Sequence, residues 1–196
     1  MSGVINRAGS RSGVVGHMSD VVLLRKDQLP SSGAYEVKDT FRKEFKTYEF
    51  VFHEMKFVTD NIQLRFNFSA DNGSSWVTGS NYSARSLQVI GGSTSIPINL
   101  TNAAYATVGG YGNQGGVGNE GSSGSVWIYD PMNPAARKQG RNEWMIWHYS
   151  GVVSWAAGAF AYQSSDPFNA CKFYPSSGNF DSSTTTYGAV SVYGYR

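Results

Sequence analysis

The sequence predicts an all-β protein: an antiparallel β-sandwich, jelly-roll-like, with an extended N-terminal arm. Three observations lead to this. Charged residues make up only 15% of the 196 residues, while glycine and serine together make a quarter of the chain, which disfavours a helical bundle. Aromatic residues reach 14%, too many for a disordered chain. Short apolar segments of period two alternate with turn residues, as in sandwiches and jelly rolls.

The arm is predicted over residues 1–33 and the sandwich over residues 34–196. Glycine and serine punctuate the arm at 9–13 and again at 30–33. The strongest apolar segment of the arm is a run of four residues, which we expect to dock the arm onto a partner. This run consists of Val21, Val22, Leu23 and Leu24.

The first strands are predicted from residue 47 onward. In residues 47–57 the large apolar side chains change face after Phe52, which indicates a β-bulge. Residues 62–69 alternate strictly between apolar and polar, as a half-buried strand does. Before them, Phe41 and Phe45 stand four residues apart, a spacing that makes a short helix over residues 38–46 the alternative to a further strand.

The later strands are read from apolar runs between turns. Residues 86–89 alternate, and residues 126–129 form a short apolar strand. Residues 144–149 are apolar on both faces, which indicates a central or interfacial strand. Only Ser150 and Gly151 separate this strand from residues 152–162, so the two are predicted to form a tight hairpin. Residues 168–174 and 184–195 complete the set.

A long loop is predicted at residues 109–124, because half of these residues are glycine. The loop contains a G-x-G-x-x-G pattern at residues 110–115. A dinucleotide site needs a helix after this pattern, and more glycine follows instead, so we interpret it as a chance match. We expect no bound cofactor.

The most specific local pattern resembles an Asp-box, S-x-D-x-G-x-S/T-W, in residues 69–76. Asp71 is expected to accept backbone N–H groups across a hairpin turn, Gly73 to supply a positive φ, and Trp76 to pack beneath. The box is repeated in sialidases and other β-propellers. It occurs once here, and the chain is too short for six blades, so its role is predicted to be structural.

No catalytic or metal motif is recognised. The three histidines are far apart in sequence, and Cys171 has no nearby histidine. A two-carboxylate glycan hydrolase stays an alternative, its candidates being Glu120, Asp130, Glu143, Asp166 and Asp181. A carbohydrate-binding role is a further alternative, because exposed aromatic rings can stack on sugars. The candidates for contact with a glycan or partner are Tyr105, Tyr111, Trp127 and Trp155.

Charge is distributed unevenly. Residues 1–71 carry 19 of the 30 charged groups, and the net charge of the whole chain is +2. This charge is too small and too mixed to predict nucleic-acid binding. No apolar run is long enough to predict a membrane span.

Several segments resemble virion proteins of tailed bacteriophages, marine ones especially. These segments are residues 3–16, 48–61, 64–69 and 174–195, the last with its Ser-Ser-Gly-Asn and aromatic–Gly steps. The resemblance implies a non-enzymatic structural protein on the virion surface, either a capsid decoration protein or a short tail fibre or adhesin. It implies assembly in the host bacterial cytoplasm, attachment through the arm, and as partners other virion proteins and copies of itself, for example in a trimer. A host surface glycan is a further expected partner.

Overall fold

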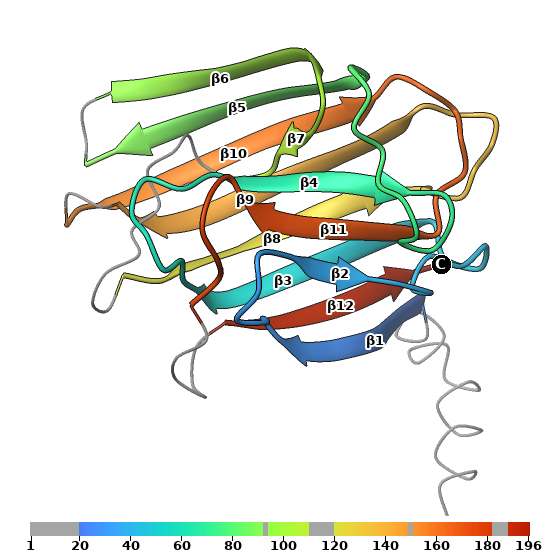
Figure 1. The fold of residues 1–196 in the computed structure, drawn as a ribbon, viewed down its shortest axis with the longest axis horizontal. Coiled ribbons are helices and arrows are strands. Elements are labelled where there is room, and N and C mark those ends of the chain that lie inside the picture. Colours follow the sequence, from blue (N-terminus) through green and yellow to red (C-terminus); the bar gives the residue numbers. More distant parts are fainter. Residues whose placement is uncertain (1–19, 92–93, 110–119, 149–150, 182–187) are drawn as a thin grey trace, which may run out of the picture.

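The computed structural model describes residues 20–91, 94–109, 120–148, 151–181 and 188–196. In this part of the chain, twelve strands form two antiparallel sheets without an α-helix, as expected for a β-sandwich. Figure 1 shows the smaller sheet lying over one face of the larger sheet. The sequence prediction of an all-β antiparallel sandwich is therefore confirmed.

The large sheet has eight strands and the small sheet has four. The order in the large sheet is β1 (Val21–Gln28), β12 (Ala189–Tyr195), β3 (Thr47–Met55), β8 (Ser122–Tyr129), β9 (Lys138–Trp147), β10 (Val153–Tyr162), β5 (Tyr82–Ile90) and β6 (Thr94–Ala103). The order in the small sheet is β2 (Tyr35–Val37), β11 (Ala170–Pro175), β4 (Leu64–Ser69) and β7 (Ala106–Thr107).

Aromatic side chains fill the space between the sheets. The ring of Phe173 on β11 lies 5.0 Å from Phe50, 5.1 Å from Phe52 and 5.2 Å from Phe66, measured between ring centroids. Phe50 and Phe52 belong to the large sheet, whereas Phe66 is on β4 of the small sheet. All four rings are fully buried. Phe173 therefore joins the two layers at the centre of the core.

Three sequence predictions about the strands are confirmed. The register of β3 against β8 shifts between Phe52 and Met55, where Glu54 has a φ of 47°, so the bulge is present. Strand β9 is central, between β8 and β10. The predicted hairpin joins β9 to β10, and the backbone N–H of His148 donates to the carbonyl of Val152 over 2.8 Å.

The alternative of a short helix over residues 38–46 is wrong, because this segment consists of bends and turns. Asp39 has a φ of 55°, which a right-handed helix does not accept. The phenol of Tyr48 accepts a hydrogen bond from the backbone N–H of Arg42 and donates to the Arg42 carbonyl over 2.9 Å. The Tyr48 hydroxyl therefore pairs the backbone N–H and carbonyl of Arg42, two groups that a helix would otherwise pair. Phe41 and Phe45 are nevertheless buried.

Two further segments differ from what their sequence patterns predict. In β5 the apolar residues Leu87 and Val89 point to solvent, while Gln88 is buried and donates to the Ser154 hydroxyl over 3.2 Å. Residues 122–124, predicted as loop, begin strand β8. A Cβ at position 124 would lie 2.4 Å from a β9 carbonyl, so glycine permits the close strand approach here.

The run Val21 to Leu24 lies in β1, at the edge of the large sheet, where it pairs with β12. Val22 and Leu24 pack partly against the core, whereas Val21 and Leu23 are exposed. The boundary predicted after residue 33 thus falls between two strands of the sandwich, β1 and β2. Residues 1–19 of the predicted arm lie outside the described residues.

Replacing Phe173 by alanine is expected to destabilise the fold by about 3–5 kcal/mol, because it removes contacts to both sheets and leaves a cavity. Chemical denaturation followed by tryptophan fluorescence measures this loss. The control is Met145→Ala, at a side chain that is 61% exposed, for which we expect a change within about 0.5 kcal/mol. Similar losses in the two variants would contradict the central role of Phe173.

Candidate functional site: the outer face of the large sheet

The face of the large sheet that points away from the small sheet carries large apolar side chains. We call this face the outer face. Along β9 and β10 the burial alternates, so every second residue points outward. Six outward residues on three neighbouring strands form what we call the apolar patch: Leu87, Val89, Met145, Trp147, Val153 and Trp155.

The strand register makes the apolar patch continuous. Trp155 on β10 lies opposite both Met145 on β9 and Val89 on β5, and Val153 lies opposite Trp147. Directly opposite residues in neighbouring antiparallel strands share a face and come close enough to touch. Monomeric proteins rarely leave a continuous patch of this kind open to water.

Two of the predicted aromatic contact residues, Trp127 and Trp155, lie together on the outer face. Both line a hollow of about 260 Å³ that also includes Glu143 and Met145. The indole N–H of Trp155 donates to the carboxylate of Glu143 over 3.3 Å, and this bond orients the ring. The guanidinium of Arg141 lies 4.2 Å from the ring centroid of Trp127.

A second hollow of about 410 Å³ lies beside the first on the same face. Its wall includes Arg85 on β5, Arg141 and Gln139 on β9, Tyr129 on β8 and the small residue Ala159 on β10. None of these residues was among the contact candidates predicted from the sequence. One sequence signal could have indicated this hollow: Ala157, Ala159 and Ala161 alternate along the strand, so one of its faces carries no large side chain.

The structure separates the other predicted contact residues from this face. Tyr105 lies between β6 and β7, and the guanidinium of Arg65 lies 4.0 Å from its ring centroid. Arg65 belongs to β4 of the small sheet, so Tyr105 is beside the other layer. Tyr111 and the glycine pattern at 110–115 lie outside the described residues.

The Asp-box residues form a compact turn after β4. The Asp71 carboxylate accepts hydrogen bonds from the Ser75 backbone N–H over 2.8 Å, from the Ser75 hydroxyl over 2.6 Å and from the Ser69 hydroxyl over 2.7 Å. Gly73 has a φ of 82°. Trp76 is half-buried, with the Lys172 ammonium 5.0 Å from its ring centroid. The hydrogen bonds from Ser75, and then that from Ser69, lower the pKa of Asp71 to about 2.

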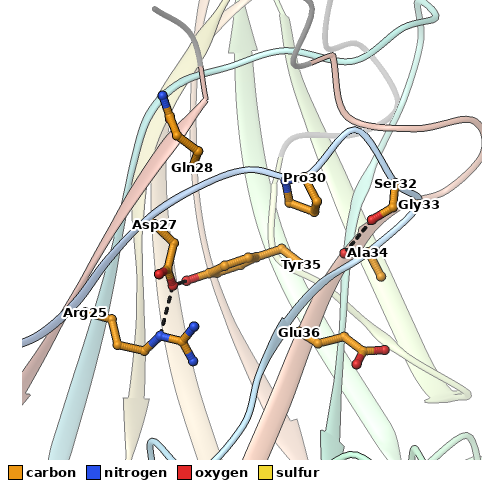
Figure 2. Close-up of a pocket in the computed structure, with 9 residues that line it drawn as sticks. All are labelled: Arg25, Asp27, Gln28, Pro30, Ser32, Gly33, Ala34, Tyr35 and Glu36. Carbon is orange, nitrogen blue, oxygen red and sulfur yellow. Dashed lines mark hydrogen bonds and ion pairs between the residues drawn. The ribbon is translucent and has the colours of Figure 1, made fainter. Parts of the chain in front are cut away.

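A larger hollow, of about 770 Å³, lies between β1 and β2 (Figure 2). Its polar side chains satisfy one another. Asp27 accepts a 2.6 Å hydrogen bond from the phenol of Tyr35 and a 2.9 Å ion-pair contact from Arg25. Burial, followed by the hydrogen bond to Asp27, raises the pKa of Tyr35 far above its usual range. These contacts close the corner between the two sheets, so we assign this hollow a structural role.

The carboxylates considered for hydrolysis do not gather at one site: Asp130 and Asp166 both lie near the Lys138 ammonium, whereas Glu120 lies near His148 and Glu143 lies on the outer face. Asp130 binds Asn133 and Lys46 beside one hollow, Glu143 lines a different hollow, and Asp166 accepts a hydrogen bond from Ser164. Across the described ranges, no group of three or more His, Cys, Asp or Glu is placed to hold a metal ion. Cys171 is fully buried, which raises the pKa of its thiol well above the usual value.

Comparisons with protein-family models, curated proteins and solved structures give no match. A search of the described residues finds no helix long and apolar enough to cross a membrane. The outer face of the large sheet is therefore identified as the candidate site from its geometry alone.

Substitution Asp71→Asn is expected to lower the melting temperature at pH 7. The pKa of Asp71 is about 2 in the folded protein, against an ordinary value of 3.8, so its charge contributes stability above about pH 4. This contribution is lost as the pH falls through the folded-state pKa. The difference in melting temperature between wild type and variant should therefore shrink from pH 4 toward pH 2.

The control for this experiment is Glu44→Gln, which removes an exposed carboxylate that contacts Arg42 only loosely, at 3.9 Å. We expect it to leave the melting temperature nearly unchanged at pH 7. A pH-independent difference for Asp71→Asn would show that the charge of Asp71 does not hold the turn.

Proposed function

We propose that this chain is a non-enzymatic structural component of a tailed-phage virion, displayed on the particle surface and attached through its N-terminal residues. The observation that carries the proposal is the apolar patch on the outer face. A regular sheet that exposes six large apolar side chains in register is suited to packing against another protein surface. The partners are other virion proteins and further copies of this chain.

Two features of the outer face support assembly rather than catalysis: its carboxylate Glu143 is already hydrogen-bonded, and its strands are rigidly held. Glu143 on the outer face is engaged with Trp155. The apolar side chains project from the middle strands of the sheet, which are held on both sides by neighbouring strands. Such a surface is rigid before binding, and rigid surfaces lose less conformational entropy on association than mobile loops do.

The position of β1 supports attachment through the N-terminal residues. β1 lies at the edge of the large sheet and begins at Val21, opposite Tyr195 on β12. The chain before Val21 therefore joins the sandwich at a sheet edge, away from the apolar patch on β5, β9 and β10. An attachment segment and a packing surface can then act independently.

Substitution Val153→Asp tests the packing surface. Val153 is 50% exposed, so the variant should fold with an almost unchanged melting temperature, while its incorporation into particles should fall at least tenfold because a charge is placed in the contact. The measurement is the copy number per purified particle. The matched control is Val58→Asp, at a valine that is 56% exposed and lies outside the apolar patch. Equal incorporation of the two variants would contradict the proposed contact.

Deletion of residues 2–19 tests the attachment segment. The deletion ends before β1, so the pairing of β1 with β12 is kept and the melting temperature should stay unchanged. We expect the truncated chain to be absent from purified particles. Particles that contain it at the wild-type copy number would show that attachment does not need these residues.

A further inference from the structure

A groove on the outer face runs along β10. Three of the outward residues of this strand are alanines, namely Ala157, Ala159 and Ala161, whereas β9 and β5 on either side present longer side chains. Exposed strand positions usually carry β-branched or aromatic residues, so a row of alanines leaves a channel. The hollow of about 410 Å³ lies over the Ala159 and Ala161 end of this row.

Two arginines flank the groove and line its hollow. Arg85 on β5 and Arg141 on β9 both lie opposite Ala159. Two strand spacings separate their backbones, which is about 10 Å. A guanidinium side chain is long enough to reach toward the middle of such a channel from either wall.

Neutral partners hold both arginines. The guanidinium of Arg85 donates to the side-chain oxygen of Asn99, and that of Arg141 lies over the ring of Trp127. Within the part of the chain that the structure describes, neither arginine forms an ion pair. Asn99 is on β6 and Trp127 is on β8, so each guanidinium rests on the strand outside the groove. An anionic group in the groove would draw both side chains inward, because each would exchange a neutral partner for a charge-assisted hydrogen bond.

The rest of the wall suits a polyhydroxylated ring. Tyr129 lines the same hollow and is partly exposed, so its aromatic face is available for the C–H face of a sugar. Gln139 and Ser83 provide an amide and a hydroxyl that exchange hydrogen bonds with sugar hydroxyls. Glu143, two residues beyond Arg141 on β9, places a negative charge toward the Trp155 end and orients an anionic ligand away from it.

We propose that this groove binds an acidic saccharide. Its carboxylate would lie between Arg85 and Arg141, and its ring would lie against Tyr129. The inference is separate from the proposed role in the virion, because the groove is built by the isolated chain and lies beside the apolar patch rather than within it.

The first experiment identifies the ligand class. The purified full chain is applied to a glycan array that carries sialylated, uronate-containing and sulfated glycans together with their neutral counterparts. Binding to carboxylated glycans in preference to their neutral counterparts is expected. Retention of no acidic glycan, or equal retention of acidic and neutral glycans, would overturn the proposal.

The second experiment locates the site by isothermal titration calorimetry with the best acidic glycan. Arg85→Gln and Arg141→Gln should each weaken binding about tenfold or more, the loss expected for one charged hydrogen bond. The control is Arg137→Gln, at an exposed arginine just before β9 that is not part of the hollow. Unchanged affinity in both groove variants would overturn the assignment.

The third experiment fills the groove without changing any charge. Ala159→Leu should abolish saccharide binding and preserve the melting temperature, because position 159 is exposed. The matched control is Ala135→Leu, at an exposed alanine in the turn before β9. Normal binding by Ala159→Leu would place the ligand elsewhere.

Titration with sodium sulfate alone completes the test. Sulfate that binds as tightly as the glycan would show a small-anion site, and the saccharide proposal would fail. Incorporation of the Arg85→Gln and Arg141→Gln chains into particles is measured in parallel. Normal incorporation with lost glycan binding separates the groove from the packing surface, so each proposal can fail alone.

Discussion

The packing of Phe173 against both sheets is the interaction on which the rest of the structure depends. β11, which carries Phe173, lies between β2 and β4 in the small sheet. The ring of Phe173 contacts Phe50 and Phe52 on β3 of the large sheet. Phe66 and Phe68 extend the same aromatic cluster from β4 toward Phe160 and Phe168. Since a four-stranded sheet covers an eight-stranded one, a dense aromatic layer provides much of the apolar burial between them.

Because the core lies between the two sheets, the outer face of the large sheet does not contribute side chains to it. Its residues need only be compatible with strands, and they can be large and apolar, as in the apolar patch, or small, as along β10. The register fixes their mutual positions. A surface of this kind combines a rigid frame with side chains that can change without loss of the fold.

The strands could be predicted from the sequence where large apolar side chains mark the faces of a strand. The bulge in β3 follows from the change of phase after Phe52, and the centrality of β9 follows from its two apolar faces. The pattern was misleading where side chains satisfy the backbone, as Tyr48 does for the turn at Arg42. It was also ambiguous in β5, where the polar Gln88 is buried and its apolar neighbours are exposed, since alternation defines two faces without saying which is inside. Trp127 and Trp155 could be named from composition, but Arg85 and Arg141 could not, because only strand pairing brings residues 56 positions apart to the same alanine.

The position of β12 has a consequence for how the protein is made. β12 follows every other described strand along the chain, yet it lies between β1 and β3, and it provides the partner edge for both. Until residues 189–195 have left the ribosome, β1 has no strand to pair with and β3 has one open edge. The large sheet can therefore be completed only at the end of synthesis, when β12 pairs with β1 and β3. A chain released early exposes unpaired strand edges, which are prone to pair with other chains.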